Sequence, residues 1–374
     1  MERITHSPRL LAAPIAVAVV LGLILMSAIL PMIKMSPKNI PVGIVAADQG
    51  EIGKTLAAGF MQNAPETVKF IQFDSVAQLE KAMDERDVYG ALVLPQDFSA
   101  KLATLRTDAP EKATVQIYVN EGANPTVATL MQNALTTMAS MLNAQLSAQM
   151  LSGNAAASIP AARVLDYANP VQTEIVKVHA TGNLGNAPLS FLTGVWFTSL
   201  IGAVALYLFG NKRRFESRAD KLKLNTIQSV MPFVYGLVAG YVLAWYSTWL
   251  YGFEYESFNK VALYLALVVA AFVFMIFATL RWLKLPSVVI YVLLMFFSMA
   301  AVQLAPEMVP EFYRNYIFSW LPIRIYVDGL REILFFSGDY FNGYSMILVW
   351  ILVVALVLVW VKNLEEKTET AKAK

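Results

Sequence analysis

The stretch DQGEIGKT, which begins at Asp48, comes close to a phosphate-binding loop. Such a loop needs the pattern G-x-x-x-x-G-K-[ST], in which glycines let backbone amides surround a phosphate and the lysine reaches its oxygens. Gly53, Lys54 and Thr55 match this pattern, but Asp48 occupies the position of the first glycine. A carboxylate there would repel a phosphate. We therefore interpret the stretch as a turn between a strand and a helix, shaped by Asp48 and Gly50, with Lys54 in solvent.

The chain has almost no cysteine or histidine residues that could carry out chemistry. The chain has no cysteine and two histidines, His6 and His179, which are far apart in the sequence. Disulfides, thiolate metal sites and cysteine nucleophiles are excluded, and a histidine cluster within one chain is not available. We expect no catalytic residue, no metal ligand and no cofactor in this chain, and we do not expect an enzyme.

A compensated set of charges lies in the segment WLPIRIYVDGLREILFFSGD. Arg324 and Asp328 are four residues apart, and Asp328 and Arg331 are three apart, so one helical face can carry all three. The segment is too short and too charged to span a bilayer, which predicts a re-entrant or interfacial helix near residues 311–337. It either rests on the outer leaflet or forms a gate. The candidate gate residues are Pro322, Arg324, Tyr326, Asp328, Gly329, Arg331 and Glu332.

A basic segment, NKRRFESRADKLK, begins at Asn211. Basic residues beside a membrane span usually fix its orientation and contact anionic lipid. The alternative is a short coupling helix that docks on a cytoplasmic ATPase. The candidate residues for that contact are Arg214, Glu216, Arg218, Asp220 and Lys221.

The composition indicates the environment in which these groups act. Of 374 residues, 57% are hydrophobic and only 15% are charged, which is typical of an integral membrane protein. A net charge of +2 gives no argument for binding nucleic acid. We therefore expect the lipid bilayer to be a partner of this chain.

Apolar runs of about 20 residues, the length that crosses a bilayer as a helix, predict six spans. The first is expected to be an uncleaved anchor, because its apolar run is longer than that of a signal peptide. The spans offer nothing that titrates near neutral pH, which argues against an autonomous proton-coupled transporter. They run over Leu10–Ile33, Pro188–Phe209, Val230–Tyr251, Val261–Leu280, Pro286–Leu304 and Tyr344–Val361.

Basic residues predict the orientation, since they are retained on the cytoplasmic side. They concentrate in the segment after Asn211, between Arg281 and Lys284, and in the tail after Val361, which are alternate connections. Both termini are then cytoplasmic. The long connection after the first span, residues 36–187, is extracytoplasmic.

That connection is patterned as an α/β domain. Apolar, β-branched runs predict strands at Ile40–Ala46, Val68–Phe73, Tyr89–Leu94 and Val115–Val119, separated by segments with helical periodicity. A long charge-free helix is predicted at about residues 126–151. It either covers the sheet, extends back toward the membrane as a stalk, or contacts a second subunit. A connector follows at residues 154–162, and residues 171–187 lead back to the bilayer.

The fold class is therefore a polytopic α-helical membrane protein with six spans and an extracytoplasmic α/β domain between the first two. The predicted parts are residues 1–35 with the first span, 36–187 as the outer domain, 188–362 as a five-helix membrane domain, and 363–374 as a cytoplasmic tail.

Several motifs carry a family resemblance. The stretches PKNIPVGIVAADQGEIGKTLAAGF, YGALVLPQDFSAKL and IYVNEGANP resemble steps of the YhgE/Pip (phage infection protein) group within the ABC-2 permease superfamily. The segment WLPIRIYVDGLREILFFSGD is similar to an ABC-2 pattern, carried by Pro322, Tyr326, Gly329, Leu330 and Arg331. The resemblance covers nearly the whole chain.

This resemblance implies a dimeric permease that works with a separate ATPase subunit. We expect export of an amphipathic or hydrophobic compound. The alternative is an envelope protein that transports nothing and whose outer domain binds a partner, such as a secretion component or a phage.

Overall fold

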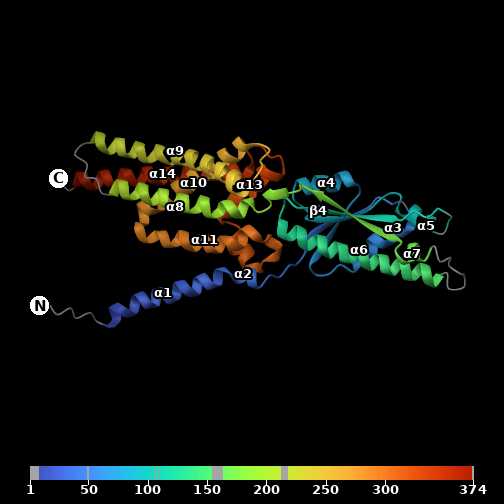
Figure 1. The fold of residues 1–374 in the computed structure, drawn as a ribbon. Coiled ribbons are helices and arrows are strands. Elements are labelled where there is room, and N and C mark those ends of the chain that lie inside the picture. Colours follow the sequence, from blue (N-terminus) through green and yellow to red (C-terminus); the bar gives the residue numbers. More distant parts are fainter. Residues whose placement is uncertain are drawn as a thin grey trace. The chain divides into compact units, whose positions relative to one another are not determined.

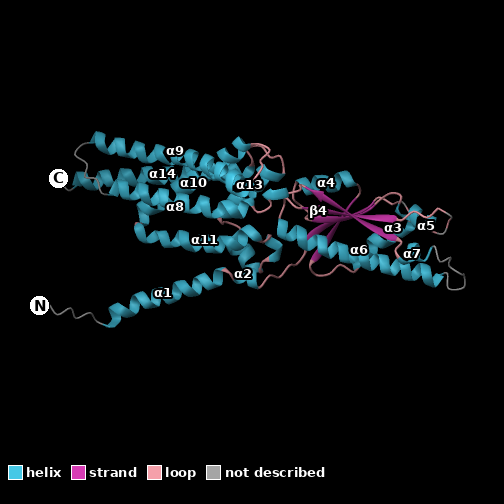
Figure 2. Ribbon diagram, in the orientation of Figure 1, coloured by secondary structure: helices cyan, strands magenta, loops and turns pink. Residues whose placement is uncertain are grey.

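The computed structural model describes residues 8–48, 50–105, 107, 109–153, 163–211 and 218–372. The chain separates into a helical unit, residues 1–35 with 186–374, and an α/β unit, residues 36–185. Figure 2 shows that the strands belong to the second of these. His6 and the predicted connector at residues 154–162 lie outside the described residues.

The helical unit contains six stretches that are long and apolar enough to cross a membrane (Figure 1). Each of the six predicted spans overlaps one of them, so the prediction of a six-span membrane protein is confirmed at this level. The helices are α1 (Pro8–Ala28) with α2 (Leu30–Ile33), α8 (Ala187–Asn211), α9 (Arg218–Tyr251), α10 (Phe258–Leu283), α11 (Val288–Gln303) and α14 (Gly343–Lys372).

Helix α10 forms the centre of the helical unit. It packs along α9, α8 and α14, and most of its side chains are buried. Glycines on α9 permit the closest of these approaches, because a Cβ atom at Gly240 would lie 2.4 Å from the amide nitrogen of Ala266. Small residues bring helices together in this way in membranes, where packing rather than the hydrophobic effect drives association.

Between α11 and α14 the chain is not a simple loop. It forms η4 (Pro306–Met308), α12 (Glu311–Tyr313), the π-helical turn η5 (Arg314–Phe318) and then α13 (Pro322–Phe335). A short 3-10 turn, η3 (Leu285–Ser287), separates α10 from α11. Tyr313 ties this region to the first span, since its hydroxyl donates to the carbonyl oxygen of Ser27 at 2.7 Å.

The α/β unit is built on one five-stranded sheet in the order β2-β1-β3-β4-β5. All neighbours are parallel except β3 and β4, which are antiparallel. The strands β1 and β2 have the predicted bounds, and β3 and β4 overlap the predicted ones. They are β1 (Ile40–Ala46), β2 (Val68–Phe73), β3 (Gly90–Leu94), β4 (Ala113–Asn120) and β5 (Val171–Val178).

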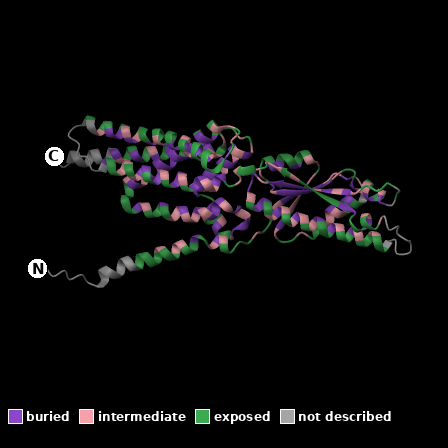
Figure 3. Cartoon of the chain, in the orientation of Figure 1, coloured by how far each residue is buried: buried purple, intermediate pink, exposed green. Residues whose placement is uncertain are grey.

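Helices cover both faces of the sheet (Figures 1 and 3). On one face α4 (Val76–Asp84) buries Leu79 and Met83 against Val45 and Val93. On the other, α6 (Pro125–Gly153) packs on β3 and β4. The remaining helices of this unit are α3 (Glu51–Gln62), α5 (Phe98–Thr104), α7 (Val164–Ala168) and the 3-10 turn η2 (Gly182–Leu184).

Strand β5 corrects the interpretation of residues 171–187 as a simple return to the bilayer. Residues 171–178 pair in parallel with β4 along its whole length. Only Val171 in this strand is fully buried, because β5 is an edge strand with most side chains in solvent. Polar cross-strand contacts hold it, including Lys177 to Glu121 at 2.7 Å.

Candidate functional site

Helix α13 is the predicted gate helix, and it is packed inside the helical unit rather than resting on its surface. Pro322 stands at its first position, where the missing amide proton costs nothing. The helix contacts α8, α10, α11 and α14. Its apolar side, with Ile323, Val327 and Leu330, is fully buried. These contacts place α13 against four of the spans, and its role as a gate stays a prediction.

Gly329 sets how closely α13 approaches α10. A Cβ atom at this position would lie 2.1 Å from the hydroxyl oxygen of Tyr264, which is far inside van der Waals contact. That hydroxyl donates to the carbonyl oxygen of Tyr326 at 2.9 Å. The glycine thus lets a buried tyrosine of a central span bond directly to the backbone of the gate helix.

Tyr326 makes a second connection across the unit. Its side chain is fully buried, and its hydroxyl donates to the carbonyl oxygen of Pro188 at 3.0 Å. Pro188 lies in the first turn of α8, so its carbonyl belongs to another span. Two tyrosine hydroxyls therefore join α8, α10 and α13 through backbone oxygens.

The three charges of α13 form the network that their spacing predicts. Asp328 accepts from Arg324 Nε at 3.3 Å and from Arg331 Nη1 at 3.4 Å. Arg331 also donates through Nη2 to the carbonyl oxygen of Val302, near the end of α11, at 2.8 Å. The Arg331 side chain is 7% exposed, against 34% for Arg324, so the network runs from the surface into the unit.

The backbone of Glu332 closes the end of the helix. Its carbonyl oxygen accepts from the amides of Phe336 and Gly338, at 3.2 and 3.1 Å, which closes the last turn. Ser337 between them has φ of 50°, the left-handed conformation that ends many helices.

Sequence reasoning missed the residues that hold α13 from other helices. Tyr264, Pro188 and Val302 are brought to it by the fold from segments 29 or more positions away in the chain. The one signal that could have found a member of this set is a tyrosine in the middle of an otherwise aliphatic span, Tyr264 in VALYLALVV.

The DQGEIGKT turn is closed by its own carboxylate. Asp48, which is buried, accepts from the amides of Gly50 and Gly53, at 3.2 and 3.1 Å, and from the hydroxyl of Ser99. These amides at the start of α3 are the groups that a phosphate would need. Lys54 is exposed, as predicted.

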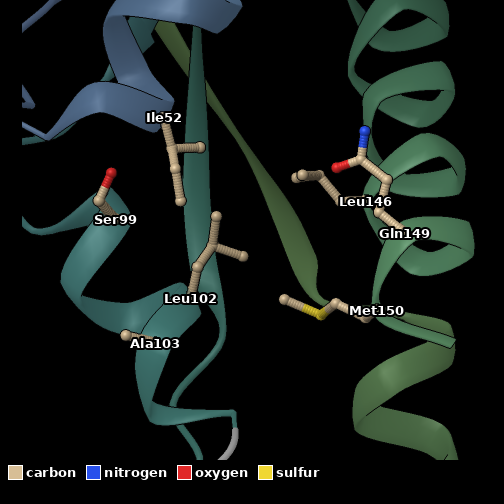
Figure 4. Close-up of a pocket in the computed structure, with 7 residues that line it drawn as sticks. All are labelled: Ile52, Ser99, Leu102, Ala103, Leu146, Gln149 and Met150. Carbon is tan, nitrogen blue, oxygen red and sulfur yellow. The ribbon is translucent and has the colours of Figure 1, made fainter. Parts of the chain in front are cut away.

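A pocket of about 290 Å³ lies beside this turn, between α3, α5 and α6 (Figure 4). Ile52 and Leu102 reach into it from one side and Leu146 and Met150 from the other (Figure 4). None of its lining residues is charged, so the pocket offers a phosphate no counter-charge.

A larger groove of about 650 Å³ separates α3 from α6 within the α/β unit. Its lining is free of charge and includes Met141, which is 66% exposed. Figure 3 shows α6 buried toward the sheet and exposed on its other side. The lining residues are Thr55, Leu56, Gly59, Phe60, Asn63, Pro65, Ala134, Thr137, Met138, Met141, Leu142 and Gln145.

Comparison with protein families decides the assignment of the whole chain. Residues 9–361 match the family described as ABC-2 family transporter protein. The chain belongs to the ABC-2 transporter family. Comparisons with curated proteins and with solved structures returned no match.

Membership of the ABC-2 family makes this chain the membrane component of a transporter rather than an enzyme by itself. Such a permease usually works with a separate ATPase. The geometry of the α/β unit agrees with that division, because the anion-binding amides of its glycine-rich turn are already taken by Asp48.

The candidate ATPase-coupling residues of this ABC-2 chain are only partly described. Arg214 and Glu216 lie outside the described residues. Arg218, Asp220 and Lys221 belong to the first turns of α9, which continues without a break into the span. The described part of the segment is therefore the end of a span and not a separate short helix.

Proposed function

We propose that this chain is a homodimeric ABC-2 permease that exports an amphipathic or hydrophobic compound across the bacterial cytoplasmic membrane, driven by a separate ATPase subunit. The observation that carries the proposal is the family match over residues 9–361 in a chain whose only glycine-lysine turn is closed by Asp48. ATP must then be bound by another protein. Within the superfamily, the motifs quoted above favour the YhgE/Pip group.

The orientation we propose places both termini and the segment after Asn211 in the cytoplasm. The α/β unit then lies outside, as an extracytoplasmic domain between the first and second spans. The distribution of lysine and arginine over alternate connections supports this arrangement.

Helix α13 is proposed to be the outer gate. It meets four membrane-spanning helices, and its charges are compensated by one another and by backbone oxygens. A second arrangement of this helix requires several of these bonds to break together. That behaviour suits an element that opens when the surrounding spans move.

The homodimer rests on the family resemblance, and α1 has a face on which a second copy could pack. Leu23 and Met26 on this helix are 60% and 70% exposed, and α1 is contacted mainly by α11 within the chain. Lipid or a second copy would cover this apolar face. The absence of charge from the middle of the spans supports a substrate that enters from the bilayer.

Transport by inside-out membrane vesicles tests this function. ATP added outside should drive accumulation of the neutral fluorescent probe N-phenyl-1-naphthylamine, or of another amphipathic dye, in vesicles that contain this chain and its ATPase. Vesicles with the R331A variant should accumulate less. Uptake that is the same with and without the chain, across a panel of such dyes, would contradict export.

A second function is favoured by the groove between α3 and α6. A charge-free groove of this size, with Met138 and Met141 in its lining, could hold an apolar helix of a partner protein in the envelope, without any transport. Substitution of Met141 by Asp would then abolish partner binding and leave dye export, if any, unchanged.

A further inference from the structure

An apolar groove lies on the outer surface of the helical unit, between α10 and α14. Its volume is about 360 Å³, within the range of roughly 300–1,000 Å³ that is common for ligand sites. Trp350 and Val354, on its rim, are 64% and 53% exposed. The lining residues are Met275, Ala278, Thr279, Ile347, Trp350, Ile351, Val354, Ala355 and Leu358.

The surroundings of this groove are set by the two helices that form it. Both are among the six stretches able to cross a membrane, and Trp350 and Val354 on the rim are exposed, so lipid can reach the groove. An apolar groove in that position is filled by an acyl chain, because lipid chains surround it at high concentration. The hydroxyl of Thr279 in the lining is hydrogen-bonded to the carbonyl oxygen of Met275 and to the hydroxyl of Tyr291. A bound molecule therefore does not have to supply a hydrogen-bond partner for it.

One end of the groove is basic and aromatic. The indole nitrogen of Trp282 donates to the carbonyl oxygen of Leu358, a lining residue, at 3.2 Å. Lys362 Nζ lies 4.9 Å from the centroid of the Trp282 ring. Arg281 Nη2 donates to Asn363 Oδ1 at 2.6 Å. Two cationic side chains thus stand about one helical turn beyond the end of the apolar lining.

Along the two helices the apolar groove is followed by a tryptophan and then by basic groups. This order matches the layers of a membrane leaflet. Tryptophan is enriched at the level of the lipid headgroups, and lysine or arginine there attracts anionic lipid. Lys284, which is exposed, adds a third basic residue at the same end of α10. In the sequence Glu365 and Glu366 follow Lys362 closely, and their negative charges oppose the binding of an anionic headgroup. The preference for such a headgroup therefore has to be measured with lipids that differ in the headgroup alone.

We propose that the groove binds one phospholipid with an anionic headgroup, its acyl chain between α10 and α14 and its phosphate beside Arg281 and Lys362. The site is independent of the proposed transport function, since it requires only that the two helices lie in a membrane. It gives the helical unit a contact that depends on the lipid composition of the leaflet.

Native mass spectrometry of the full chain in detergent tests the proposal. Phosphatidylglycerol and phosphatidylcholine with identical acyl chains are added at equal concentration, and the bound fraction of each is compared. We expect phosphatidylglycerol to bind more tightly, by about fivefold for each basic residue that contacts it. Equal retention of the two lipids would overturn the anionic assignment, and the wild-type protein alone decides this point.

Two matched pairs of variants test the position of the lipid. V354W fills the groove from an exposed position, whereas V357W adds the same bulk at an equally exposed position of α14 outside the lining. V354W should lose both lipids and V357W should retain them. The double variant R281Q/K362Q should lose the preference for phosphatidylglycerol, while K260Q, at the opposite end of α10, should keep it.

The alternative occupant is a second copy of this chain. If V354W binds both lipids like the wild type, the groove is not the lipid site. If V354W instead converts a dimer to a monomer, a second copy covers the groove, and the lipid proposal is overturned.

Discussion

Tyr264 and Gly329 approach each other so closely that a Cβ atom on the glycine would lie 2.1 Å from the tyrosine hydroxyl oxygen. This contact brings a membrane-spanning helix against the backbone of the short helix α13. The tyrosine hydroxyl bonds to the carbonyl oxygen of Tyr326 at the same place. The pair therefore fixes the position of the proposed outer gate.

Substitution of Gly329 by alanine should force the two helices apart. Overpacking of a buried contact costs about 1–3 kcal/mol, so G329A should lower the thermal unfolding midpoint of the purified protein and reduce export. G343A is the control, since no atom lies within 4 Å of a Cβ built at that glycine. The double variant G329A/Y264F should recover part of the loss, and G329A with unchanged stability would refute the contact.

Arg331 and Arg324 bond to the same carboxylate but should differ in their effect. R331A removes one partner of the partly buried Asp328 and frees the buried carbonyl oxygen of Val302, which should cost about 1–3 kcal/mol. R324A removes a partly exposed partner and should cost less than about 1 kcal/mol. Both variants should insert into the membrane, and R331A alone should impair export. An unaltered phenotype for R331A would reduce α13 to a packing element.

Asp48→Gly provides a direct test of the glycine-rich turn, because it completes the phosphate-loop pattern in the sequence. We expect D48G to bind no ATP. It should lower the free energy of unfolding by about 1–3 kcal/mol, since two amides and the Ser99 hydroxyl lose a buried acceptor. Fluorescent ATP binding and thermal unfolding report the two effects. ATP binding by either D48G or the wild type would contradict the account.

The absence of cysteine makes the proposed orientation easy to test. Single cysteines at Lys81 and Glu254, both exposed, should react with a membrane-impermeant maleimide in spheroplasts. A cysteine at Lys284, also exposed, should react only after the membrane is permeabilised. Labelling of K284C in sealed spheroplasts, or protection of K81C, would reverse the orientation.

The sequence predicted what depends on local periodicity. The six spans and the strands β1 and β2 follow from apolar runs, and the charge network of α13 follows from the three- and four-residue spacing around Asp328. Each of these features is determined by contacts with residues nearby in the sequence or with the surrounding lipid.

The features that the sequence did not predict depend on distant partners. Strand β5 is an edge strand with one fully buried residue, so its composition resembles that of a connector, and only its pairing with β4 shows it to be a strand. The partners of α13 could not be predicted because they too are distant in the sequence. The charges predicted a re-entrant or interfacial helix and left a gate and a helix on the outer leaflet open, whereas the bond from Arg331 to the carbonyl oxygen of Val302 depends on another helix.

The central claim, that a separate ATPase drives this ABC-2 permease, is tested most directly by purification of the full chain from membranes of its native host in mild detergent, followed by identification of co-purifying proteins. An ATP-binding subunit should co-purify in a constant ratio, and replacement of Glu216 and Asp220 by Gln and Asn should weaken its retention. If no ATPase accompanies the protein, and the double variant leaves export unchanged, the chain does not act as an ATP-driven permease.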